Sequence, residues 1–171
     1  RDRINEMASG VIGTTNTVIA HRFGCGGPAN DPANRSTPRD LSRIYEQIGG
    51  GGLLDATEMA AFTSLMLGPL WPTLERTVRD EADDLGLDDD AAQAFLDGMD
   101  LLYKAGWWDS DLSVAGYLTL PACPGAPPAK YAFSVFEEGA TWVDGGFDPS
   151  DLVAVVLRGE IRSALVAAAD C

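Results

Sequence analysis

The spacing of apolar residues changes near residue 100 and divides the chain into two regions. Up to residue 99 apolar residues recur mostly every three or four positions, which predicts amphipathic helices; from Leu101 they follow a period of two, which predicts strands. We therefore expect a helical region over residues 1–100 and a region of strands with a closing helix over residues 101–171. The first signal, over residues 3–24, predicts a helix, a loop and a second helix. Its apolar positions are Ile4, Met7, Val11, Val18, Ile19 and Phe23.

Capping signals mark two further helices in the first region. Thr37 fits the N-cap, Pro38 the first helical position and Asp40 the third. A run of four glycines at 49–52 ends this helix, and the sequence 55–58 is a capping box that begins the next one. The residues expected to face inward are Leu41, Ile44, Tyr45 and Ile48 in the first of these helices, and Met59, Phe62, Leu65 and Met66 in the second.

Acidic residues cluster at residues 80–90, where the chain carries seven aspartates and glutamates. A calcium loop needs acids at alternating positions, a glycine at the sixth position and a glutamate at the twelfth, and this run does not comply. We therefore predict a solvated helix–turn–helix face. A short helix over residues 91–99 follows, with Phe95, Leu96 and Met99 turned inward.

The second region predicts strands near residues 101–108, 113–120 and 131–138, the last two paired antiparallel across a proline-rich linker. A final helix follows, with Asp148 as N-cap and Pro149 and Asp151 in its first turn. Its predicted buried face is Leu152, Val155, Val156, Ile161, Leu165 and Val166. The fold class is α/β (α+β), an antiparallel sheet flanked by helices. Three strands make a poor closed domain, so we expect the sheet to need partners outside this chain.

Composition and charge narrow the functional classes. The chain has 171 residues, 46% of them hydrophobic, which is typical of a globular domain. A net charge of -14 argues against nucleic acid and anionic membrane surfaces as partners. No apolar run approaches the roughly 18 residues that a transmembrane helix requires. The chain opens on Arg1 with no initiator methionine and no signal peptide, from which we expect a processed or trimmed product.

The cysteines Cys25, Cys123 and Cys171 match no metal-binding spacing. Two lie in Gly/Pro loops and one at the end of the sequence, which suits disulfides in an oxidising compartment; reduced, buried thiols are the alternative. An odd number leaves one cysteine over. His21 has no Cys or Ser placed as a partner, so we expect a structural or exposed role. We find no metal, phosphate-loop or cofactor motif in the sequence and expect no cofactor.

Candidate chemistry centres on Lys104-Ala105-Gly106 in the first predicted strand. A lysine there can bind a substrate carboxylate, and a glycine lets a substrate backbone approach the strand edge. A Lys-x-Gly strand, a strand pair and a terminal helix resemble the C-terminal half of the penicillin-recognising serine hydrolases, the class A β-lactamases and D,D-peptidases. The resemblance implies that Lys104, Ala105 and Gly106 bind substrate. It also implies that a backbone amide near Trp108 contributes to an oxyanion hole.

Residues 7–24 resemble the helix–loop–helix in which that family carries a Ser-Asp-Asn motif. Aligned without gaps, the motif falls on Val11, Ile12 and Gly13, none of which can shuttle a proton. A shifted alignment places it on Thr14-Thr15-Asn16, which would supply hydroxyl and amide groups. The gapless alignment is preferred because it keeps the flanking residues in place.

The sequence 36–41 resembles the threonine-proline start of the helix after the family's omega loop. The preceding loop contains one carboxylate, Asp31, and no counterpart of the acidic deacylation residue, so we do not expect an efficient β-lactamase. The family's Ser-x-x-Lys nucleophile is absent, because neither Lys104 nor Lys130 follows a serine by three residues.

The resemblance implies part of a split β-lactamase/transpeptidase-like domain, incomplete without an N-terminal segment. The favoured function is a non-catalytic or very weakly active relative that keeps the fold as a binding or scaffold module. The alternative is a serine hydrolase of the penicillin-binding D,D-peptidase or β-lactamase type whose nucleophile lies on a separate N-terminal chain. In both, the expected ligand is a peptidoglycan-like peptide or a β-lactam. The expected location is extracytoplasmic: secreted or in the cell envelope, for example as a lipoprotein.

Overall fold

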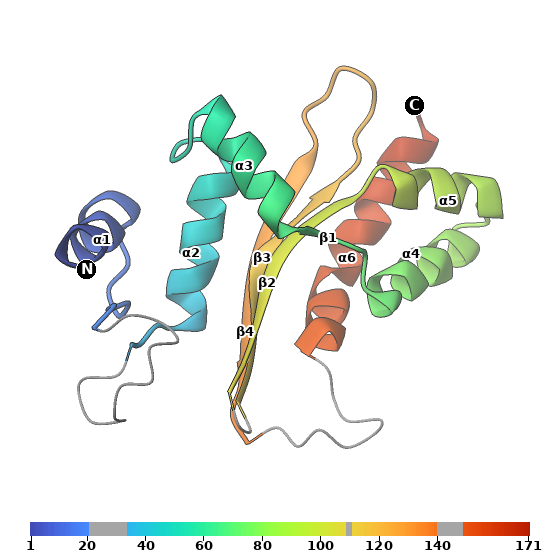
Figure 1. Cartoon of the computed structure of the whole chain (residues 1–171). Coiled ribbons are helices and arrows are strands. Elements are labelled where there is room, and N and C mark those ends of the chain that lie inside the picture. Colours follow the sequence, from blue (N-terminus) through green and yellow to red (C-terminus); the bar gives the residue numbers. More distant parts are fainter. Residues whose placement is uncertain (21–33, 109–110, 140–148) are drawn as a thin grey trace.

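The computed structural model describes residues 1–20, 34–108, 111–139 and 149–171. Its centre is a four-stranded antiparallel sheet in the order β1-β2-β3-β4, with α2 and α3 on one face and α4, α5 and α6 on the other (Figure 1). The predicted fold class is confirmed. The strands are β1 Leu67–Gly68, β2 Asp100–Trp108, β3 Asp111–Leu120 and β4 Ala129–Glu137. The helices are α1 Asp2–Met7, a π-helical turn η1 Ala8–Ile12, α2 Pro38–Gly49, α3 Ala56–Met66, α4 Pro72–Asp84, α5 Asp89–Asp97 and α6 Pro149–Ala169.

The three predicted strands are confirmed, with ends shifted by one or two residues. Each pairs antiparallel with the next: Lys104 lies opposite Ala115, and Ala115 lies opposite Ser134. The sequence did not predict β1, because two residues are too few to show an alternating pattern. It joins the outer side of β2 at Leu101 and Leu102.

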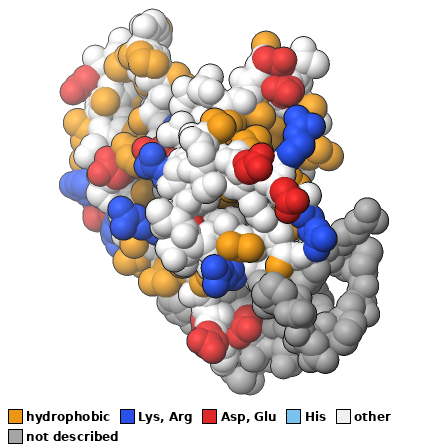
Figure 2. Space-filling model, turned by 90° about the vertical axis from the view of Figure 1, so that its left-hand side faces the viewer, with side chains coloured by type: hydrophobic (Ala, Val, Ile, Leu, Met, Phe, Trp, Pro, Cys, Tyr) orange, Lys and Arg blue, Asp and Glu red, His pale blue; other side chains and the backbone are white. Residues whose placement is uncertain are grey.

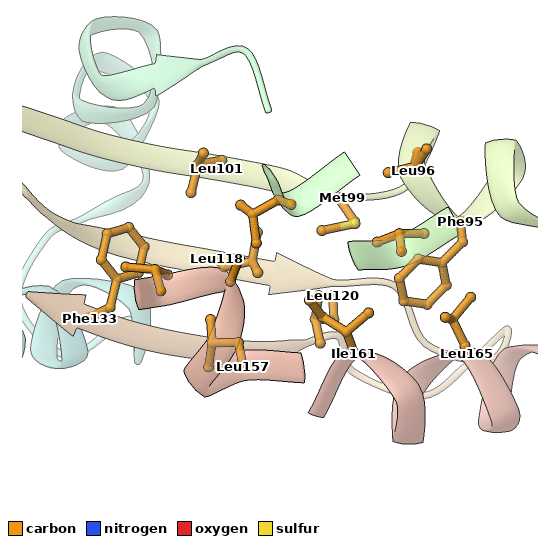
Figure 3. Packing of buried hydrophobic residues seen from close by; sticks show 14 of the residues in the cluster. Phe95, Leu96, Met99, Leu101, Leu118, Leu120, Phe133, Leu157, Ile161 and Leu165 are labelled. Carbon is orange, nitrogen blue, oxygen red and sulfur yellow. The ribbon is translucent and has the colours of Figure 1, made fainter. Parts of the chain in front are cut away.

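Two hydrophobic cores lie on the two faces of the sheet. The larger core packs α4, α5 and α6 against the sheet; Figure 3 shows Leu157, Ile161 and Leu165 of α6 pointing toward the strands. The smaller core packs α2 and α3 against the other face. Strand side chains alternate between faces, so Leu101 enters the larger core and Leu102 the smaller one.

The predicted helix starts are confirmed for α2 and α3. The Thr37 hydroxyl accepts a hydrogen bond from the Asp40 amide, and Asp55 and Glu58 form the capping box. Glycine ends α2, whose C-cap is Gly50. Phe95, Leu96 and Met99 are buried as predicted. In α3, however, Leu65 is 82% exposed, so its predicted inward orientation is wrong.

The predicted second helix near residue 18 is wrong in its described part. Val18 instead forms an isolated bridge with Arg35, and the Ile19 amide donates to Asn5 Oδ1 at 2.8 Å. Thr17, Val18 and Ile19 are all β-branched, and such residues favour extended backbone. The predictions for His21, Phe23, Cys25, Asp31 and Asp148 lie outside the described residues.

The predicted buried face of α6 is wrong in four positions. Ile161 and Leu165 are buried, but Val155 and Val156 are 70% and 74% exposed, and Leu152 and Val166 are also exposed. The sheet instead packs against the face with Val153, Ala154, Leu157, Ile161 and Leu165. The sequence could not distinguish these two faces, because both carry apolar residues at helical spacing.

The acidic segment contains one buried carboxylate. Most of it lies at the ends of α4 and α5 as predicted, but Glu81 is 3% exposed and accepts hydrogen bonds from Arg158 and Arg162 of α6. The hydrogen bonds from Arg162 and Arg158 lower the pKa of Glu81, although burial opposes them. Glu81 therefore joins α4 to α6 rather than forming part of a solvated face.

A disulfide joins Cys123, in the linker after β3, to Cys171. The disulfide alternative is therefore confirmed for two of the three cysteines. In the described ranges no cluster of His, Cys, Asp and Glu side chains could hold a metal ion. Within the same ranges, no helix has the length and apolar character needed to cross a bilayer.

Candidate functional site

Strand β2 places Lys104 on the α2–α3 face of the sheet. Leu102 lies in the smaller core, and Lys104, two residues further, projects on the same side beyond the core. The side chain is exposed, and its Nζ donates to the carbonyl of Ala105 at 2.9 Å. Within the described part of the chain, no carboxylate forms an ion pair with Lys104. Its charge is therefore available to an anionic ligand.

The strand edge beside Lys104 is open among the residues that the structure describes. β1 pairs only with Leu101 and Leu102, so among described residues the rest of β2 has no strand on that side. Exposed strand edges present unpaired backbone amides and carbonyls that can pair with an extended chain. The structure thus places a cation next to a vacant backbone edge.

Gly106 lies on the same face as Lys104 and is exposed. A Cβ at this position would lie 2.8 Å from Ser113 Oγ, which itself donates to the Gly106 carbonyl at 3.3 Å. Because glycine has no side chain, no side-chain atoms project from the sheet at position 106, next to the lysine. Ala105 lies between them on the opposite face and carries no hydroxyl. The backbone of Trp108 pairs with Asp111, while its side chain lies outside the described residues.

Ser113 is a polar neighbour of the site that the sequence analysis did not single out. Its position opposite Gly106 follows from the register of β2 and β3. That register could have been proposed from the sequence, because only a few residues separate these two predicted strands.

The gapless alignment places the second motif on Val11, Ile12 and Gly13, which carry no polar side chain. Val11 is 68% exposed and ends η1 with Ile12, which is buried. Gly13 adopts a left-handed conformation with φ of 80°, which suits glycine. A Cβ at Gly13 would lie 3.2 Å from Arg43 Nε, and the same Nε donates to the Ile12 carbonyl at 2.7 Å. These residues form a structural contact with α2.

The shifted alignment places the second motif on Thr14, Thr15 and Asn16, which are buried or hydrogen-bonded within the protein. Thr14 is buried, and its hydroxyl has no hydrogen-bond partner among the described residues. Thr15 and Asn16 are exposed, and Asn16 Nδ2 donates to Thr15 Oγ1 at 2.9 Å. Within the described ranges, no hydrogen bond links residues 11–16 to Lys104. The structure therefore brings together Lys104, Ala105 and Gly106 but does not join them to this loop.

Asp40 holds this loop against the start of α2. Its buried carboxylate accepts hydrogen bonds from the Thr15 amide at 3.2 Å, the Asn16 amide at 2.7 Å and the Thr17 hydroxyl at 2.9 Å. Burial alone would raise the pKa of Asp40, but the bonds from Asn16, Thr15 and Thr17 together outweigh it and lower that pKa. Asp40 is therefore a structural anchor that is ionised at neutral pH.

The loop and α1 lie on the outer side of α2. In Figure 1, α1 lies beyond α2 as seen from the sheet. Figure 2 views this side and shows acidic and basic side chains interspersed over the visible surface. That mixture does not form the continuous basic surface by which nucleic acid is bound.

A pocket of about 180 Å³ lies further along the same face of the sheet, at the C-terminal end of α2. Lys130 Nζ donates to the Gly49 carbonyl at 3.0 Å and lies 5.4 Å from the centre of the Tyr117 ring. Burial raises the pKa of Tyr45 to about 12, so this phenol stays protonated. The pocket is smaller than the roughly 300–1,000 Å³ of typical ligand sites. Its lysine contacts Gly49 and Tyr117 on other elements, whereas the hydrogen bond of Lys104 goes to the neighbouring residue Ala105.

Comparison with known proteins gives a fold likeness. No protein-family model and no curated protein sequence matches the chain. The solved structures that do match include PBP-A and a PBP-A mutant described as an acyl-enzyme complex with penicillin G. Each has a TM-score of 0.61 and 18% identity over 95% of this chain. The chain spans about half of their length, 51% of PBP-A and 52% of the mutant. The chain therefore has a β-lactamase/PBP-like fold, as the sequence resemblance implied.

Proposed function

We propose that this chain belongs to a β-lactamase-like cell-envelope protein that keeps the fold as a binding or scaffold module and is non-catalytic or very weakly active. One observation carries the proposal. Every residue that could stand for the second catalytic motif is apolar, buried, or in a loop anchored by Asp40. Lys104, in contrast, is exposed and free of ion pairs within the described ranges. The chain thus has a lysine that could bind an anionic ligand, Lys104, but lacks the polar second-motif side chains that proton transfer would require.

The ligand we propose is a carboxylate with an extended amide backbone, such as a β-lactam or a peptidoglycan-like peptide. Lys104 would bind the carboxylate, and the open edge of β2 would pair with the backbone. The side chain of Ala105 lies on the opposite face and carries no hydroxyl, so it adds no hydrogen bond to a carboxylate at Lys104. The charged hydrogen bond from Lys104, which contributes about 1.5–3 kcal/mol, is therefore the side-chain contact that we expect to hold the carboxylate.

An extracytoplasmic location is part of this proposal. Disulfides persist mainly in oxidising compartments, and the bond between Cys123 and Cys171 is consistent with one. The fold likeness to penicillin-binding proteins supports the same location.

The alternative is a serine hydrolase whose Ser-x-x-Lys segment lies on a separate N-terminal chain. The observation that favours it is the span of the match, which leaves about half of the PBP-A chain without a counterpart here. In this case the serine would attack an amide carbonyl, its neighbouring lysine would accept the proton, and a backbone amide near Trp108 would stabilise the oxyanion. Lys104 would again bind the substrate carboxylate.

Substituting Lys104→Ala is expected to weaken reversible binding of penicillin G about tenfold or more, because a charged hydrogen bond is lost. Binding is measured by calorimetry on the complete protein as expressed from its whole coding region. Lys130→Ala is the matched control, since that lysine is engaged with Gly49 and Tyr117. Equal binding by wild type and Lys104→Ala would contradict the proposed site.

A fluorescent penicillin separates the two functions. If the protein is non-catalytic, a folded sample incubated with the fluorescent penicillin should carry no label after it is denatured. A covalent label that requires Lys104 would instead establish the serine hydrolase.

A further inference from the structure

The pocket at the C-terminal end of α2 carries charges of both signs. Its volume is about 180 Å³, and its walls come from the last turns of α2 and from strands β3 and β4. An acidic residue, Glu46 of α2, and a basic residue, Lys130 of β4, both line it. Tyr117 of β3 and Ala132 of β4 add an aromatic ring and a methyl group. The pocket thus combines an acid, a base and apolar surface in a small volume.

The two charges of this pocket do not neutralise each other. Glu46 and Lys130 form no ion pair, and within the described part of the chain the Glu46 carboxylate has no other partner. An ammonium group has three hydrogens to donate. Lys130 uses one of them for the Gly49 carbonyl at 3.0 Å, so the others are available to a ligand. The pocket therefore offers one place for a cation and one for an anion.

The phenol of Tyr45 is a third polar group of the pocket. Tyr45 is 8% exposed, yet its hydroxyl has no hydrogen-bond partner among the described residues. Buried hydroxyls normally have a partner, because leaving one unpaired is costly. Burial raises the pKa of Tyr45 to about 12, so the phenol is protonated at neutral pH and can donate. Since Tyr45 and Lys130 line the same pocket, an anion bound there can receive hydrogen bonds from both.

We propose that this pocket binds a free α-amino acid with a small side chain, such as glycine or alanine. The carboxylate of the amino acid receives hydrogen bonds from Lys130 and Tyr45. Its ammonium group pairs with Glu46, and its side chain contacts the apolar surface of Tyr117 and Ala132. This is a second binding site, and it does not depend on the function proposed above.

Size and charge select this class of ligand. The pocket is smaller than typical sites for drug-sized molecules, so it suits a ligand of few atoms. A simple anion would meet the negative charge of Glu46, and a simple cation would meet the positive charge of Lys130; like charges at close range oppose binding. A zwitterion avoids both penalties, because each of its charges has an opposite charge in the pocket. Penicillin G, an anion without an ammonium group, does not meet this requirement.

An NMR titration tests the pocket. Isotope-labelled protein expressed from its complete coding region is titrated with alanine into the millimolar range, and the amide signals of Gly49, Gly50 and Ala132, which line the pocket, are followed. We expect saturable shifts of these signals. Acetate and methylamine each carry one of the two charges and should bind about tenfold or more weakly, because one charged contact is lost. Absence of saturable shifts with alanine, or equally strong binding of acetate or methylamine, would overturn the proposal.

Two substitutions test the residues of the pocket. Glu46→Gln is expected to weaken alanine binding about tenfold or more, since the ammonium group loses its charged partner. Tyr45→Phe removes only the hydroxyl and keeps the ring, whose centre lies 6.2 Å from that of Phe62, so binding should weaken about fivefold. Glu75→Gln, at an exposed acid of α4 on the other face of the sheet, is the matched control and should leave binding unchanged. The same spectra report whether each variant is folded. Undiminished binding by either pocket variant would overturn the assignment.

Discussion

Substituting Gly116→Ala is expected to lower the free energy of unfolding by about 3 kcal/mol or more, at the upper end of the range for an overpacked core. Gly116 lies at the centre of β3, opposite Tyr103 of β2 and Phe133 of β4. A Cβ there would lie 2.1 Å from the Leu102 carbonyl oxygen and 2.8 Å from the Tyr103 Cα. Both are backbone atoms of the neighbouring strand, so the clash cannot be relieved by a side-chain rotation.

The same substitution should affect the candidate site. Lys104 follows Tyr103 directly, so any displacement of β2 that accommodates the new methyl group moves the lysine as well. Urea denaturation measures the stability, and binding of penicillin G to the folded fraction reports the site.

Gly159→Ala is the control for Gly116→Ala. A Cβ at Gly159 meets nothing within 4 Å, and the residue lies inside α6. Alanine there should raise the stability of the chain by about 0.5–1 kcal/mol, the usual difference from glycine in a helix. Loss of stability in both variants alike would contradict the steric explanation.

Substituting Asp40→Ala is expected to cost about 2–4 kcal/mol, because the Thr15 and Asn16 amides would each lose a charged acceptor. Hydrogen exchange at these two amides should rise sharply if the loop leaves α2, and this readout distinguishes loop release from general destabilisation. Asp55→Ala is the control. It removes an exposed N-cap carboxylate from α3 and should cost about 1 kcal/mol with no effect on Thr15 or Asn16.

The Asp40 contribution should depend on pH in a defined direction. Burial tends to raise the pKa of Asp40, but the hydrogen bonds from Asn16, Thr15 and Thr17 favour the ionised form and hold that pKa below its ordinary value of 3.8 in the folded chain. A group whose pKa is lower in the folded state stabilises it above the unfolded pKa, and this contribution disappears as pH falls through the folded pKa. The stability difference between wild type and Asp40→Asn should therefore be constant from pH 7 to pH 5 and shrink below about pH 4. A difference that grows on acidification would contradict this assignment.

The sequence predicted those parts of the fold that depend on local signals. A period of two predicted β2, β3 and β4, and capping residues predicted the starts of α2 and α3. The Lys-x-Gly pattern selected a lysine that proves to be exposed at an open edge; its role in binding stays a prediction.

The predictions failed where contacts between distant parts of the chain determine the structure. The sequence identified Asp40 only as a residue in the first turn of a helix, because its bonds to residues 15–17 connect positions more than 20 apart. For α6, two apolar faces competed, and only packing against Leu118 and Leu120 selects one of them. The same ambiguity explains why Leu152, Val155, Val156 and Val166 were predicted to be buried although the structure exposes them.

The bond between Cys123 and Cys171 changes how tension would pass through the molecule. Cys171, just after α6, is covalently joined to a position 48 residues earlier, in the linker that follows β3. A force applied to the chain at Cys171 would therefore act on the linker at the end of β3 and bypass β4 and α6. Under such a force the helix would stay packed on the sheet, whereas in the reduced protein α6 would detach first.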